Sequence, residues 1–182
     1  MPNNIDNAIR AAIRSMNEVV VPSLDPADPL AREQSALVLQ LLDFLRVRIP
    51  YVQQRDRAEL VIYHDVAAQL MHELATLFPD QLDRVRDILA EAETAIADPV
   101  PVPDDLSRLA DDLRTVLSDL VRAAAEAPGP LRQRVESAIA RGSKPIMDLQ
   151  RSWFLPTGMV PRDSTLPELG DLLKVSATAE RR

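Results

Sequence analysis

The chain has 182 residues, of which 46% are apolar, and it carries a net charge of −7 at neutral pH. This length suits a single domain with a sizeable core, and the lack of cysteine excludes disulfides, thiolate metal sites and cysteine nucleophiles. Because nucleic acids require clustered cations and a membrane span requires roughly 18 consecutive apolar residues, neither partner is expected, and the cytoplasm is the simplest location.

Few aromatic residues and many Leu, Ala, Arg and Glu residues favour helix over strand. Apolar residues spaced three and four apart predict a first helix over residues 4–22, with a narrow apolar face. A second helix is predicted over residues 29–48, with Asp28 as its N-cap. Its broad apolar stripe predicts deep packing, and Pro50 is expected to end or kink it.

The third predicted helix has the most regular apolar pattern in the chain. Spacings of three and four alternate along Leu60, Tyr63, Ala67, Leu70, Leu74 and Leu77. A fourth helix is predicted to begin at Pro79 and to end before Pro99, and the short connection predicts that these two helices are antiparallel neighbours. Residues 98–103 read DPVPVP, and alternating prolines favour an extended polyproline conformation.

The remaining helices are predicted from caps and prolines. Asp104 or Asp105 is expected to cap a fifth helix, which stops before a Pro-Gly-Pro turn. A shorter sixth helix is predicted over residues 130–142, because Gly142 suits a left-handed cap. A separate helix is then predicted to restart over residues 143–153.

These elements predict an all-α fold, a helical bundle of about four to five long helices with short accessory helices and a C-terminal tail. We expect residues 1–155 to form the bundle domain. Residues 156–182 contain scattered Pro, Gly, Ser and Thr and are expected to form the tail, with one short helix over residues 166–174.

Two histidines, His64 and His72, are the only side chains with an unperturbed pKa near neutrality. Along one helix they are about 80° and about 12 Å apart, so they cannot hold the same metal ion. His64 is expected to be half-buried and hydrogen-bonded to a neighbouring helix, or else to act in acid–base catalysis with Asp43 or Glu59. His72 is expected to be exposed. No metal or cofactor is predicted.

Trp153 and Phe154 are the only adjacent aromatic residues and lie in the run RSWFLP. They can form an exposed anchor for a protein partner, or they can close one end of the core. Tyr63 has an apolar ring on a packed face, with its hydroxyl expected at the edge.

Charge is distributed unevenly along the chain. Residues 80–126 carry a net charge of −7, whereas residues 127–182 carry +3 and include Arg132 and Arg134. The aspartates of the acidic stretch are interpreted as caps and as the solvated face of a helix. The basic residues can meet the acidic stretch of the same chain or of another copy, which favours self-association.

Three functional hypotheses follow from these patterns. The leading one is a non-enzymatic helical protein that forms a homo-oligomer, such as a homodimer, or binds a protein partner. The second is a bundle with an internal pocket for an apolar or acyl small molecule, because Ala67, Ala92 and Ala124 on packed faces can leave space between helices. The third is an enzyme that uses His64 as acid or base.

Within the first 80 residues, the run VVVPSLDPADPLAREQSALVLQLLDFL resembles that of small uncharacterised bacterial helical proteins, which look like companions of phosphotransferase-type kinases and acyl-CoA dehydrogenases. The resemblance covers under half of the chain and carries no catalytic motif. It implies an accessory role. Nineteen arginines against two lysines also suit a bacterium with a GC-rich genome.

Overall fold

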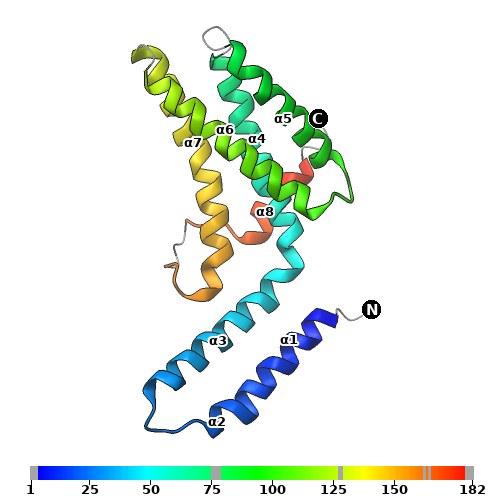
Figure 1. Cartoon of the computed structure of the whole chain (residues 1–182), viewed down its shortest axis with the longest axis vertical. Coiled ribbons are helices and arrows are strands. Elements are labelled where there is room, and N and C mark those ends of the chain that lie inside the picture. Colours follow the sequence, from blue (N-terminus) through cyan, green and yellow to red (C-terminus); the bar gives the residue numbers. More distant parts are fainter. Residues whose placement is uncertain (1–3, 75–78, 127–128, 162, 164, 179–182) are drawn as a thin grey trace. The chain divides into compact units, whose positions relative to one another are not determined.

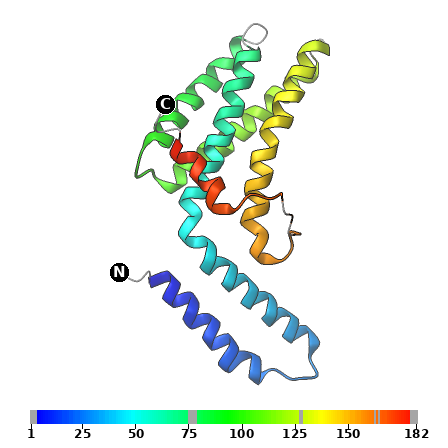
Figure 2. The same cartoon turned by 180° about the vertical axis from the view of Figure 1, so that it is seen from behind.

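The computed structural model describes residues 4–74, 79–126, 129–161, 163 and 165–178. These residues form helices and connecting turns without any β-strand, which confirms the predicted all-α bundle class (Figures 1 and 2). In this part of the chain, no helix combines the length and the apolar character that crossing a bilayer would require. The chain divides into two compact units.

The first unit comprises residues 1–52 and 153–162, and we call it the hairpin unit. Its two longer helices pack side by side and antiparallel (Figure 1). Its elements are α1 (Asn4–Ser15), the π-helical turn Met16–Val20, α2 (Val21–Ser23), α3 (Pro29–Arg48) and the 3-10 turns Ile49–Tyr51 and Leu155–Thr157.

Local signals in the sequence place the helix ends of the hairpin unit correctly. Pro22 lies in the last helical turn before the chain leaves the helix at Leu24. The Asp28 carboxylate accepts a hydrogen bond of 3.0 Å from the Ala31 amide, and Pro29 is the first residue of α3. The predicted cap at Asp28 and the predicted start at Pro29 are confirmed, and a proline at the first position loses no helical hydrogen bond.

The second unit comprises residues 53–152 and 163–182, and we call it the core unit. Its helices are α4 (Val52–Leu74), α5 (Pro79–Ala97), α6 (Pro103–Ala125), α7 (Gly129–Phe154) and α8 (Leu169–Thr178). Val52 and the last two residues of α7 belong to the hairpin unit.

Cross-helix contacts show that α4 and α5 run antiparallel, as predicted. The Arg57 guanidinium donates a hydrogen bond of 2.6 Å to the Ile96 carbonyl, whereas His64, further along α4, lies near Glu93, earlier on α5. Arg57 also donates to the Asp98 carbonyl, so it anchors the start of the proline-rich connection. This connection is non-helical over residues 98–102, and Pro103 already belongs to α6.

Most of the hydrophobic core lies within the core unit, where α4, α5, α6 and α7 contribute to one cluster. Its largest side chains with almost no exposure are Leu60, Leu70, Leu82, Leu106, Leu109, Leu113, Val85 and Val135. A smaller cluster joins α4, α7 and α8 through Ala58, Leu149 and Leu173. Residues beyond the predicted domain boundary at 155 therefore contribute to packing in this unit, through Leu173.

Three sequence expectations about helix ends are wrong. Residues 129–154 form one helix, α7, that contains both Gly142 and Pro145. Gly142 is not in the left-handed region, since Gly158 alone among the described residues has a positive φ, of 73°. The N-cap of α6 is Val102, which offers no side-chain acceptor, whereas Asp104 and Asp105 lie in the first turn. There their negative charges interact favourably with the positive end of the helix dipole.

Candidate functional site

Helix α3 has two apolar faces with different environments. On one face Ser35 is buried and Ala31, Leu39 and Leu42 are half-buried. The Ser35 hydroxyl donates a hydrogen bond of 2.8 Å to the Ala31 carbonyl, so its polar group is satisfied within the helix. Since α1 contacts α3, we assign this face to the contact with α1. Its small residues allow the two helices to approach closely.

The other face of α3 is exposed. The exposed fractions are 63% for Leu30, 44% for Leu37, 44% for Val38 and 55% for Leu41. At 100° per residue these four side chains span about 100° of the helix surface. We call these four residues the α3 stripe. The expected deep packing of the whole α3 pattern is therefore wrong within this chain, because the α3 stripe is exposed.

The C-terminal end of α3 carries an aromatic cluster. The Phe44 ring meets Trp153 edge-to-face at a centroid distance of 6.4 Å and stacks on Phe154 at 5.7 Å. Arg48 donates a hydrogen bond of 2.8 Å to the Trp153 carbonyl, and its guanidinium lies 5.4 Å from the centre of the Trp153 ring. Burial lowers the pKa of Arg48. The cluster holds residues 153 and 154 against α3.

The two adjacent aromatic residues have different environments. Trp153 is 6% exposed, whereas Phe154 is 45% exposed. Trp153 is therefore buried beside Phe44 and Arg48, whereas neither core cluster of the described residues includes it. The role of Phe154 as an anchor for a partner stays a prediction.

Apolar burial is unequal in the two units. Among the described residues, Trp153 is the only buried apolar side chain of the hairpin unit. That unit also holds most of the large exposed apolar side chains, which are Ile5, Val19, Leu30, Leu37, Val38, Leu41, Tyr51, Val52, Phe154 and Met159. Exposed patches of this kind mark interaction surfaces. The α3 stripe, with Phe154 near one end of the same helix, is the candidate interaction site.

The charged residues of the core unit form local pairs at the surface. Asp111 lies 2.8 Å from Arg114, and Asp119 lies 2.8 Å from Arg122. Arg132 lies 3.6 Å from Glu136 on the next turn, and Arg134 is also exposed on α7. Such exposed pairs contribute little to stability. In the described part of the chain, no group of three or more His, Asp or Glu side chains is arranged to hold a metal ion.

His64 lies between two carboxylates, with 17% of its side chain exposed. Its Nδ1 is 3.4 Å from Asp65 and its Nε2 is 3.4 Å from Glu93 of α5, and both distances are long for hydrogen bonds. Contact with Asp65, followed by contact with Glu93, raises the pKa of His64 despite its burial. The structure thus places Asp65 and Glu93 beside His64, and the predicted partners Asp43 and Glu59 are not its neighbours. The side chain of His72 lies outside the described residues.

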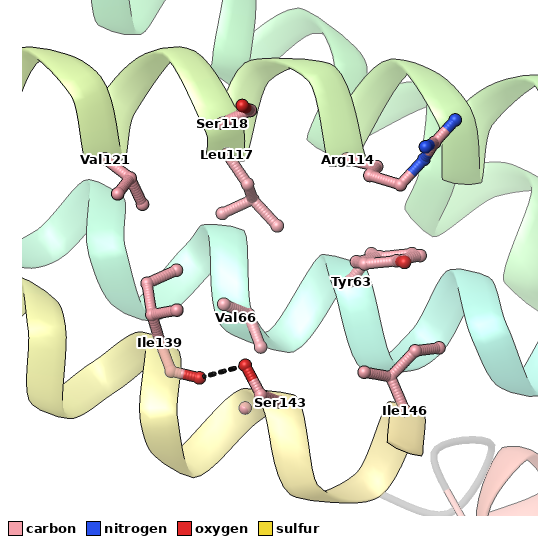
Figure 3. Close-up of a pocket in the computed structure, with 10 residues that line it drawn as sticks. Tyr63, Val66, Arg114, Leu117, Ser118, Val121, Ile139, Ser143 and Ile146 are labelled. Carbon is pink, nitrogen blue, oxygen red and sulfur yellow. Dashed lines mark hydrogen bonds between the residues drawn. The ribbon is translucent and has the colours of Figure 1, made fainter. Parts of the chain in front are cut away.

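A groove of about 250 Å³ opens between α6 and α7, with α4 as its floor (Figure 3). Sequence reasoning missed it, because Ala67, Ala92 and Ala124, which were expected to leave space, are buried in the core. Small residues instead mark the groove on α7, where Gly142 and Ser143 line it. A short run of small residues inside a helix pattern was the signal available in the sequence.

Comparison with family models, with curated proteins and with solved structures gives no match to this chain. Its function is therefore inferred from its own residues.

Proposed function

We propose that this chain is a self-associating, non-enzymatic helical protein whose α3 stripe packs against the same stripe of a second copy. The observation that supports the proposal is the exposure of Leu30, Leu37, Val38 and Leu41 on one helix face. Burial stabilises a Leu or Val side chain by about 1.5–3 kcal/mol relative to exposure. A two-fold axis would bury the stripe of each copy at once.

The spacing of the stripe favours a helix as the occupant. Leu30, Leu37 and Phe44 recur every seven residues along α3, a repeat that keeps one seam of a helix against a neighbouring helix. Two hairpins that meet through α3 would make a four-helix arrangement, which is the common way for antiparallel helix pairs to complete a core.

The small net charge of residues 1–52 favours a second copy over a strongly charged partner. Residues 1–52 contain five arginines and six carboxylates, so this segment is nearly neutral although the chain as a whole carries −7. Two copies can therefore approach through the hairpin unit without strong like-charge repulsion. The accessory role that the resemblance implies fits a protein that acts by association.

The first prediction concerns the oligomeric state. The double variant Leu37→Glu, Leu41→Glu places four carboxylates in the buried centre of the proposed interface, so we expect a monomer where the wild-type chain is a dimer. Sedimentation velocity at about 100 µM, a concentration that detects micromolar affinity, measures this change. The matched control is Val100→Glu, Val102→Glu, which alters two exposed valines of the core unit and should remain dimeric.

The absence of cysteine allows a direct test of the two-fold axis. Single Leu37→Cys and Leu41→Cys variants should form intermolecular disulfides rapidly under mild oxidation, because residues close to a two-fold axis face their own copies. Val100→Cys should cross-link slowly. A monomeric wild-type chain at the same concentration, or equal cross-linking at all three positions, would contradict the proposal.

A further inference from the structure

The groove between α6 and α7 has one apolar end and one polar end (Figure 3). Leu117 and Val121 of α6 face Ile139 of α7 toward the apolar end, whereas Tyr63 and Arg114 lie together at the other end. Its volume of about 250 Å³ is below that of pockets for drug-sized ligands. Taking roughly 30 Å³ for each group of the size of a water molecule, the space suits a ligand of about eight non-hydrogen atoms.

The Tyr63 hydroxyl offers a free hydrogen bond at the polar end. Among the described residues, no group forms a hydrogen bond with it, and its side chain is partly open to solvent. The Tyr63 side chain is half-buried on α4 and lines the groove. A ligand group at this end can therefore accept a hydrogen bond from the hydroxyl without displacing a partner of this chain.

The charges around the Tyr63 hydroxyl balance one another. Arg55 lies 2.8 Å from Glu59, and Arg114 lies 2.8 Å from Asp111. Of these four groups only Arg114 lines the groove, and its charge is paired with that of Asp111. A ligand with a charged head would lose hydration and gain no net attraction, whereas an uncharged polar head would lose little.

From this geometry we infer that the groove binds a small uncharged amphiphile of about eight or nine non-hydrogen atoms in all, with an apolar chain and an uncharged hydrogen-bond-accepting head such as a hydroxyl or carbonyl group. The chain lies along Leu117, Val121 and Ile139, and the head accepts a hydrogen bond from Tyr63. This site is separate from the α3 stripe, so it does not depend on the proposed self-association.

The test measures binding of three probes with the same chain and different heads, 1-octanol, octanoate and octylammonium, to the full-length protein. Each is kept below its solubility limit or micelle concentration and titrated by isothermal calorimetry and by NMR. We expect saturable binding of 1-octanol at one molecule per chain and weaker binding of both ions. Across shorter alcohols, each methylene should raise the affinity about fourfold, the value for burial of one methylene group.

Two variants locate the ligand. Ser118→Trp, at an exposed position lining the groove, fills the space and should weaken 1-octanol binding by about tenfold or more. Tyr63→Phe keeps the ring and removes the hydroxyl, and it should weaken 1-octanol binding by about fivefold. Val100→Trp, outside the groove, serves as the control. Lack of saturable 1-octanol binding, octanoate or octylammonium bound as tightly as 1-octanol, or binding unaffected by Ser118→Trp would overturn the inference.

Discussion

Gly142 is the clearest single position at which packing between helices constrains the residue type. A β-carbon built there would overlap a methyl group of Val66 on α4. The site therefore requires a residue without a side chain, although its backbone conformation is ordinary. The sequence suggested a helix-ending glycine, and the structure instead shows a glycine that lets α7 approach α4.

Two glycine variants test the contact between Gly142 and Val66. Gly142→Ala should lower the free energy of unfolding by about 1–3 kcal/mol, the usual cost of forcing an extra methyl group into a packed site. Gly170→Ala is the matched control, because a β-carbon there meets nothing within 4 Å. Chemical denaturation measures both. Adding Val66→Ala to Gly142→Ala should recover part of the loss, and an unchanged stability of Gly142→Ala would refute the contact.

His64 gives a pH-dependent prediction. Its pKa is raised in the folded protein by Asp65 and Glu93. The protonated ring therefore stabilises the fold at pH values below about 6.5, the unfolded pKa, and this contribution disappears as pH rises through the raised folded pKa.

We therefore expect the stability difference between the wild-type chain and His64→Gln to increase when the pH is lowered from about 8 to about 6. Urea denaturation at several pH values measures it, and Glu93→Gln should reduce the pH dependence. Glu59, whose pKa is raised by burial, is present in both proteins, so its titration cancels in the difference. A difference that decreases toward pH 6 would contradict the assignment.

At the scale of the helices, prolines and caps were only partial guides to where helices begin. Asp28 with Pro29 and Pro79 mark two starts that the sequence predicted, whereas Pro103, which was expected to lie in the extended connection, begins α6. Ser143 and Pro145 were expected to restart a helix, but both lie inside α7. Losing one backbone hydrogen bond is a local cost, and the continuous packing of α7 from Val135 to Leu149 outweighs it.

Helix α3 shows a second limit of periodicity. Its broad apolar pattern predicted deep packing, but the structure leaves the α3 stripe exposed and covers the face assigned to α1. A hydrophobic stripe in a sequence shows that a helix needs a partner, but it does not show whether the partner is in the same chain. The α3 stripe could thus be seen as a pattern in the sequence but as an exposed surface only in the structure.

At the scale of the whole molecule, the two units should differ in local stability. The core unit contains nearly all of the buried apolar side chains among the described residues, whereas the hairpin unit contains one. Local opening costs little where few apolar contacts are broken. The hairpin unit should therefore open far more readily than the core unit when no second copy covers it.

Hydrogen exchange by mass spectrometry tests this difference on the intact chain. In the monomeric Leu37→Glu, Leu41→Glu variant, amides of α3 should exchange many times faster than amides of α6. In the wild-type chain at high concentration, α3 should be protected while α6 is unchanged. Equal exchange of α3 in both proteins would mean that no second copy covers the stripe.

The sequence by itself determined the helical class, the starts of α3 and α5 and the antiparallel pairing of α4 and α5, because these depend on spacing, caps and short connections. It could not decide which apolar face is buried, whether α7 continues through Pro145, or where a groove opens. Those outcomes depend on distances between residues far apart in the chain, such as Val66 and Gly142, and such distances are set only when the helices pack together.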